Sequence, residues 1–143
     1  MDQQERQAAL NSLPHGPEFR FLDEILELDP GRSATGTYRL PQDAHFLRGH
    51  FPGAPILPGV LMIEAMAQLA GVVAQCDPEH AALRNLRLTA VRGAKILGTI
   101  LPGETLELSS EIAGRLGNLI QAKGTVSHQG QKLAEAQVTL SGD

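Results

Sequence analysis

The chain has 143 residues, of which 42% are hydrophobic and 20% are charged. This length suits one domain over residues 1–143, and the composition suits a packed core, which excludes an intrinsically disordered protein. Twelve basic and sixteen acidic residues give a net charge of −4, which disfavours broad binding to nucleic acid or to an anionic membrane. A single cysteine, Cys76, excludes an internal disulfide and a multi-cysteine zinc site. The first residues are polar and do not resemble a signal or transit peptide, so we expect a cytoplasmic protein.

The first sixty residues predict one short helix, two strands and a long loop. Residues 2–12 are mostly polar and stop before a proline, which predicts the helix. Residues 19–28 and 32–40 predict the strands, separated by an Asp-Pro-Gly turn. Residues 41–59 contain four prolines and three glycines, so we expect a stiff loop without regular structure.

Residues 60–76 are apolar on nearly every face, and their strongly polar side chains are those of Glu64, Gln68 and Gln75. At about 1.5 Å per residue this helix reaches about 25 Å, less than the roughly 30 Å hydrocarbon core of a bilayer. A carboxylate in its second turn also disfavours a membrane span. We therefore expect a helix buried inside the protein. The large apolar residues expected in the core are Val60, Leu61, Met62, Ile63, Met66, Leu69, Val72 and Val73.

The remainder of the chain predicts about four strands. Three leucines within residues 83–88 would open the first, and residues 106–112 alternate between apolar and polar side chains as a half-buried strand does. Residues 119–128 and 132–140 flank a Gln-Gly pair, which predicts a hairpin. Hairpin-linked strands favour an antiparallel sheet, so we predict an α+β fold in which one sheet curls around the apolar helix.

Chemistry is concentrated in residues 49–68. His50 lies in the proline-rich loop beside Phe51, which would restrict its motion and its contact with water. Pro58 and Gly59 stand where the helix must begin. Free backbone N–H groups and the positive end of the helix dipole would meet a ligand oxygen there, and glycine allows close approach. This arrangement suits a carbonyl that gains negative charge.

Glu64 lies more than one turn into the helix, with Gln68 four residues further on the same face. A buried carboxyl without a partner favours its protonated form, and such a carboxyl can act as a general acid near neutral pH. A histidine such as His50 is the natural base to pair with it.

Plainer interpretations stay open for each of these residues. His50 alone could be a structural histidine, and Glu64 could be a buried salt-bridge partner. His45 lies five residues before His50 and raises a metal-site alternative, which no second ligand pair supports. The remaining histidines are interpreted as structural or surface residues: His15, His80 and His128.

Residues 49–68 read Gly-His-Phe-Pro-Gly-Ala-Pro-Ile-Leu-Pro-Gly-Val-Leu-Met-Ile-Glu-Ala-Met-Ala-Gln. This segment closely resembles the signature of the FabZ-type (3R)-3-hydroxyacyl-acyl-carrier-protein dehydratases, and the resemblance extends over about residues 12–141. It implies a hotdog fold and the dehydration of a (3R)-3-hydroxyacyl chain on acyl carrier protein to the trans-2-enoyl chain in fatty-acid or related biosynthesis. It also implies a homodimer, or a trimer of dimers, and no metal or other cofactor. The flanks that agree are Leu13-Pro14-His15, Phe19, Asp23, Pro102-Gly103-Glu104 and Ala134-Glu135-Ala136.

The resemblance also implies roles for individual residues. His50 and Glu64 correspond to the catalytic pair, contributed to one site by different subunits. The amide of Gly59 corresponds to the group that binds the thioester carbonyl. We further expect the substrate to contact Phe51, Pro58, Val60 and Gln68.

Two departures from the family concern the carrier protein. Gly16 stands where an arginine usually follows Pro-His, and residues 94–99 lack the usual basic run. Residues 81–103 nevertheless contain four basic side chains and no acidic one. Arg92 and Lys95 are therefore candidates for docking the carrier, although ordinary solvated charges explain them equally well.

Two rival functions also fit the sequence. Dehydratase–isomerases, which also shift the double bond, resemble this chain but carry Asp in place of Glu64, which disfavours them. A catalytically silent hotdog protein that binds acyl carrier protein would explain the lost basic run. The intact His50, Gly59 and Glu64 argue against that second rival.

Overall fold

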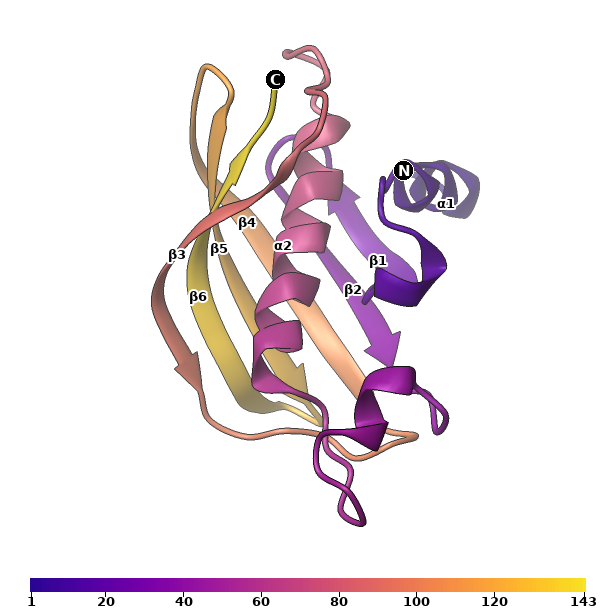
Figure 1. Cartoon of the computed structure of the whole chain (residues 1–143). Helices are drawn as coiled ribbons and strands as arrows, with labels where there is room; N and C mark the ends of the chain where they lie inside the picture. Colours follow the sequence, from indigo (N-terminus) through magenta and orange to yellow (C-terminus); the bar gives the residue numbers. More distant parts are fainter.

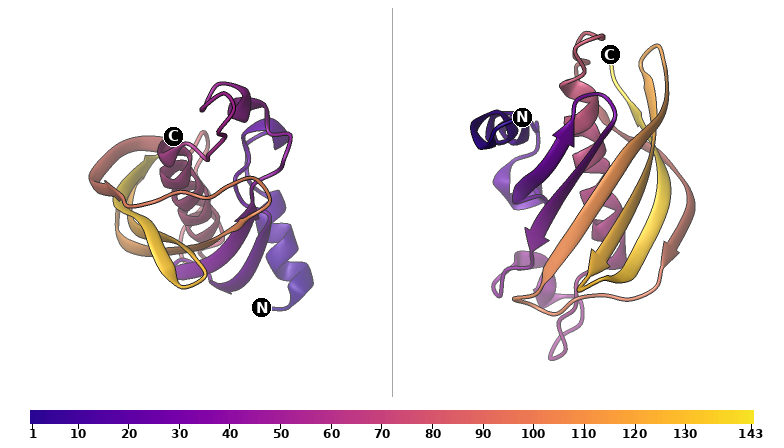
Figure 2. Two further views of the ribbon diagram at one scale, coloured as in Figure 1. Left: turned by 90° about the horizontal axis from the view of Figure 1, so that it is seen from below. Right: turned by 180° about the vertical axis from the view of Figure 1, so that it is seen from behind.

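The computed structural model describes residues 1–143, and its main feature is a six-stranded antiparallel sheet that curls around one long helix (Figure 1). Helix α2 (Gly59–Gln75) lies against the inner face of the sheet, and helix α1 (Gln3–Asn11) lies outside it, beside β1 (Figure 2). The antiparallel α+β architecture is as predicted. In the sheet order β1-β2-β4-β5-β6-β3, the strands are β1 (Glu24–Asp29), β2 (Ser33–Arg39), β4 (Thr105–Leu116), β5 (Leu119–His128), β6 (Gln131–Ser141) and β3 (Arg87–Ile96).

The local signals at α1 and at the β5–β6 hairpin are confirmed by backbone geometry. Asp2 caps α1 through a capping box, because its side chain accepts from the Glu5 N–H while the Glu5 side chain accepts from the Asp2 N–H. At the hairpin, Gln129 and Gly130 have φ values of 51° and 80°. Two successive residues with positive φ match the tight turn that joins twisted strands.

Three expectations from the sequence are wrong: the start of the first strand, the absence of regular structure in the proline-rich loop, and the start of the strand that follows α2. The strand expected from residue 19 begins only at Glu24, because Pro17–Phe19 form a 3-10 turn and a side chain, not a strand, accepts the Phe21 N–H. The loop that was expected to be irregular contains a 3-10 turn at His45–Arg48. None of the four prolines of the loop lies within this turn. The leucines expected to open the next strand also mostly precede it, since β3 begins at Arg87.

Burial of α2 against the sheet organises the core, a single cluster of 31 buried apolar residues. The Ser110 hydroxyl of β4 donates to the Met66 carbonyl at 2.8 Å. A Cβ on Gly124 of β5 would lie 2.6 Å from the Met66 sulfur, so only glycine lets the helix approach this strand so closely. Neither α1 nor α2 is long and apolar enough to cross a membrane.

One residue of α2 does not follow the buried pattern. Val60 was expected in the core, but its side chain is 69% exposed. It lies in the first turn of the helix on a side that no strand covers, whereas Met62 in the same turn is fully buried. The expectation for Val60 is therefore wrong for the single chain.

Candidate active site

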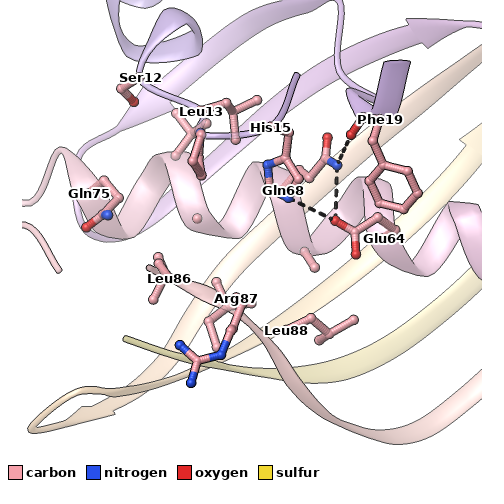
Figure 3. A pocket seen from close by; sticks show the side chains of 15 residues that line it. Ser12, Leu13, His15, Phe19, Glu64, Gln68, Gln75, Leu86, Arg87 and Leu88 are labelled. Carbon is pink, nitrogen blue, oxygen red and sulfur yellow. Dashed lines mark hydrogen bonds and ion pairs between the residues drawn. The ribbon is translucent and has the colours of Figure 1, made fainter. Parts of the chain in front are cut away.

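A cavity of about 280 Å³ runs along one face of α2 (Figure 3). The helix contributes Glu64, Gln68, Gly71 and Gln75 to its wall, a spacing of three to four residues that places them on one face. Leucines from the segment before β3, from β3 and from β6 form the opposite side, and residues 12–15 close the third side. Glu64 is the single carboxylate in the wall, so acid chemistry in this cavity depends on it.

The Glu64 carboxyl is oriented by Gln68, one turn further along α2. Gln68 Nε2 donates to Glu64 Oε2 at 3.0 Å and to the Phe19 carbonyl at 2.8 Å (Figure 3). Gln68 Oε1 accepts from the Phe21 N–H at 2.8 Å, and the Gln68 side chain is 2% exposed. The amide is therefore occupied by protein partners, and its observed role is to hold Glu64 and the segment before β1.

Glu64 has a second neighbour that the sequence did not predict. His15 Nε2 lies 3.5 Å from Glu64 Oε2, and the side chains are 26% and 18% exposed. The expectation of a carboxyl without a partner is therefore wrong. His15 was interpreted as a structural or surface residue, yet it lies in the wall of the cavity. The signal that could have marked it is its place in the Leu13-Pro14-His15 flank that matches the family.

His50 lies elsewhere, in the loop between the 3-10 turn and α2. Its Nδ1 is 3.2 Å from the Ile56 carbonyl oxygen, and its ring stacks on Phe51 with 4.4 Å between centroids. Phe51 is 56% exposed, so it covers one face of the imidazole and leaves the loop open to solvent. His50 is not among the residues that line the cavity of Glu64. One chain by itself therefore does not bring the predicted pair into one cavity.

The start of α2 has the features expected of an oxyanion site. Pro58 precedes the first helical residue, no side chain caps the helix, and the N–H groups of Gly59 and Val60 have no acceptor in the chain. A Cβ on Gly59 would lie 2.7 Å from Ile96 Cδ1. A larger residue here would therefore have to displace the side chain of Ile96, which is 51% exposed.

Tyr38 is a further titratable group near the site. Tyr38 packs edge-on against Phe21, and burial together with the nearby Asp23 carboxylate raises the pKa of Tyr38 to about 12. Its phenol therefore stays neutral over the physiological range. The structure holds no cluster of three or more His, Cys, Asp or Glu side chains, so the His45 and His50 metal alternative gains no third ligand.

The two candidate carrier-docking residues lie on β3, the strand at one edge of the sheet. Both side chains are exposed, and Lys95 Nζ is 3.8 Å from a Glu135 oxygen on β6. Arg92 makes no ion pair. The positive charge of Lys95 is thus partly balanced, whereas that of Arg92 is available to a partner.

Comparison with known proteins identifies the family of this chain. A family model described as a FabA-like domain matches residues 13–137. The chain is 36% identical over 128 residues to a protein of Clostridium acetobutylicum named 3-hydroxyacyl-[acyl-carrier-protein] dehydratase FabZ, covering 90% of each. It is 37% identical over 132 residues to the protein of the same name from Acetivibrio thermocellus, covering 92% of this chain and 89% of that one.

Solved structures with low sequence identity confirm the hotdog fold. The dehydratase heterocomplex ApeI:P from Xenorhabdus doucetiae aligns with a TM-score of 0.78 at 18% identity, over 100% of this chain and 92% of that chain. Zebra fish thioesterase superfamily member 2 aligns with a TM-score of 0.71 at 14% identity, over 99% and 95%. The family model and the sequence relatives go further than the fold: this chain belongs to the FabA-like family, among its FabZ-type dehydratases.

Proposed function

We propose that this protein removes water from (3R)-3-hydroxyacyl chains held as thioesters on acyl carrier protein and releases trans-2-enoyl chains. The observation that supports it most is the placement of Glu64, the single carboxylate of the cavity, in a FabA-like chain. Gln68 holds one oxygen of this carboxyl, so the other is free to meet a ligand. A positioned carboxyl is the group that an elimination needs at its leaving hydroxyl.

In this mechanism three groups divide the work. The free Gly59 N–H, aided by the helix dipole, polarises the thioester carbonyl and acidifies C2. His50 takes the C2 proton, and the electron pair of that C–H bond forms the C2–C3 double bond as the C3–O bond breaks. Glu64 gives its proton to the departing hydroxyl, which leaves as water. The elimination moves only protons and water, so it requires neither a redox cofactor nor a metal.

We further propose that a homodimer completes each site. His50, the proposed base, lies outside the cavity of Glu64 in the same chain. Exposed apolar side chains gather near the start of α2, where a second subunit would cover them: Phe51, Val60, Ile96 and Leu97. In such a dimer His50 would reach the Glu64 cavity of the partner subunit, and Phe51, Pro58 and Val60 would contact the substrate beside it.

The carrier protein is the second partner in this proposal. Acyl carrier thioesters present an acidic protein surface to the enzyme, and Arg92 and Lys95 are exposed cations on β3. Complementary charge on a surface rim speeds encounter and favours the correct partner. We propose these two residues as the docking contact.

The proposal is tested by incubating the purified protein with (3R)-3-hydroxyacyl carriers of several chain lengths and following the acyl mass. We expect loss of one water from the wild-type reaction, and gain of one water when trans-2-enoyl carriers are supplied instead. The matched control is the Glu64→Gln protein, which keeps the shape of the side chain and loses the acid.

The products also separate this function from its rivals. A cis-3-enoyl product would identify a dehydratase–isomerase. Carrier binding without any change of acyl mass at every chain length would identify a silent binding protein, and would contradict the proposal.

A further inference from the structure

We propose that His15 is a positioning residue that holds the Glu64 carboxyl in its reactive orientation. This inference rests on the proposed dehydratase function, because it assigns His15 a role in that reaction. His15 would act through Glu64 and not on the substrate. The contacts around the two side chains support this role (Figure 3).

Two nitrogen atoms approach the same oxygen of Glu64 from different parts of the chain. Gln68 Nε2 lies 3.0 Å from Oε2 and belongs to the same helix, whereas His15 Nε2 lies 3.5 Å from Oε2 and belongs to the segment after α1. Oε1 has no hydrogen-bond partner in the protein. Two contacts on Oε2 oppose rotation of the carboxyl and direct Oε1 to the ligand. Active sites need such placement within about 0.5 Å.

The His15 ring is itself held in place. Its face stacks on Phe19 with 6.3 Å between centroids and an interplanar angle of 24°. The Arg20 guanidinium donates to the carbonyls of Leu13 and His15 at 3.3 and 3.2 Å. One arginine therefore fixes the backbone on both sides of Pro14. These contacts restrict the position of the His15 ring, as a positioning role requires.

The protonation of the ring follows from its surroundings. His15 Nδ1 is buried and has no hydrogen-bond partner. A proton on Nδ1 would have no acceptor, whereas a proton on Nε2 has the Glu64 carboxyl oxygen nearby, so we assign the ring proton to Nε2. Nε2 is the ring nitrogen that lies 3.5 Å from Glu64 Oε2. His15 can thus serve as a donor to Glu64 through Nε2.

A double-mutant cycle separates positioning from ordinary structural support. The four proteins are wild type, His15→Ala, Glu64→Gln and the double variant. We expect His15→Ala to lower kcat roughly tenfold with KM changed less than about twofold, since coupled neighbours typically interact at this level. In the Glu64→Gln background the same change should lower kcat less than about twofold, because no acid remains to be positioned.

Two further variants control this cycle. His15→Gln keeps an N–H that can reach Glu64 Oε2, so it should recover part of the lost kcat. His80→Ala removes an exposed histidine that pairs with Asp77 outside the cavity, and its kcat should match wild type. Equal fold-losses for His15→Ala in both backgrounds would overturn the proposal, as would the absence of any recovery in His15→Gln.

A second readout does not depend on activity. Crystal structures of wild type and His15→Ala should show one orientation of the Glu64 carboxyl in the former, and a rotated or divided one in the latter. An unchanged single orientation would overturn the positioning role. If wild type fails to dehydrate any carrier substrate, the proposed function is wrong, and this comparison still decides whether His15 orients Glu64. If His15→Ala does not fold, His15→Leu, which fills most of the space of the ring and carries no N–H, replaces it in both readouts.

Discussion

Glu64 and His50 are built into the protein in opposite ways. Glu64 lies on the buried helix, inside a cavity, with Oε2 in contact with Gln68 and His15. His50 lies on a proline-rich loop, stacked on the exposed Phe51, and outside that cavity. The acid half of the proposed site is therefore complete within one chain. His50, the proposed base, reaches such a cavity only if a second subunit packs against the surface around it.

The surroundings of Glu64 and of His50 also differ in the kind of contact that holds each side chain in place. Around Glu64 the buried amide of Gln68 is bonded at both its oxygen and its nitrogen. Around His50 the ring stacks on Phe51, which is 56% exposed. Buried hydrogen bonds fix geometry inside a monomer, whereas exposed apolar groups become ordered only when another surface covers them.

The largest expected effect comes from removing the acid. Glu64→Gln should fold normally, because the amide has the same shape and can still accept from Gln68. Turnover should fall by about 10²-fold or more, since the leaving hydroxyl loses its proton donor. Steady-state kinetics on a carrier-bound substrate, with thermal unfolding as the control for folding, measures both. Near-normal turnover would remove Glu64 from the mechanism.

Mixing two inactive variants tests whether the halves belong to different subunits. His50→Ala and Glu64→Gln proteins are unfolded together, refolded, and assayed against each refolded alone. Random pairing yields about half mixed dimers, each with one intact site, so activity should return to roughly a quarter of wild type.

The alternative arrangement predicts a different result for the same mixture. If both residues came from one chain, every site would carry a lesion and no activity would return. A mass-tagged protomer reports whether subunits exchanged. Exchange without recovery of activity would contradict the shared site.

Stability measurements sharpen the contrast between the two halves. Gln68→Leu leaves the Phe21 N–H and the Phe19 carbonyl without their partner, so it should lower the free energy of unfolding by about 1–3 kcal/mol. Phe51→Ala removes a side chain that is 56% exposed in the single chain, and should change it by less than about 0.5 kcal/mol at a protein concentration low enough to dissociate the dimer. Urea unfolding at one protein concentration compares them. Equal losses of unfolding free energy in the two variants would mean that the region around His50 is packed as well as the region around Glu64.

The smallest expected effect concerns the carrier. Reversing charge with Arg92→Glu and Lys95→Glu should raise KM for carrier-bound substrate several-fold and leave a short thioester mimic unchanged. Loss of the exposed Lys95–Glu135 pair should itself matter little. Lys123→Glu, an exposed change on β5, is the matched control, and gel filtration reports any loss of the dimer. Equal effects on both substrates would exclude a docking role.

Much of the architecture followed from local sequence pattern. The apolar stretch before Cys76 predicted α2, and the Gln129-Gly130 pair predicted the turn between β5 and β6. Period and turn chemistry act over a few residues, so a sequence displays them directly. The placement of His50, Gly59 and Glu64 as candidates also came from one contiguous segment whose spacing carries the chemistry.

What the tertiary structure decided lies between residues distant in the chain. The Phe21 N–H pairs with Gln68, which is 47 residues away, and this pairing ends the strand that the sequence extended to Phe19. His15 meets Glu64 because the segment after α1 folds over α2. Val60 is exposed, although Met62 and Ile63 further along the helix are buried. Such contacts depend on how elements pack in three dimensions, and no periodicity along the chain records which surfaces will meet.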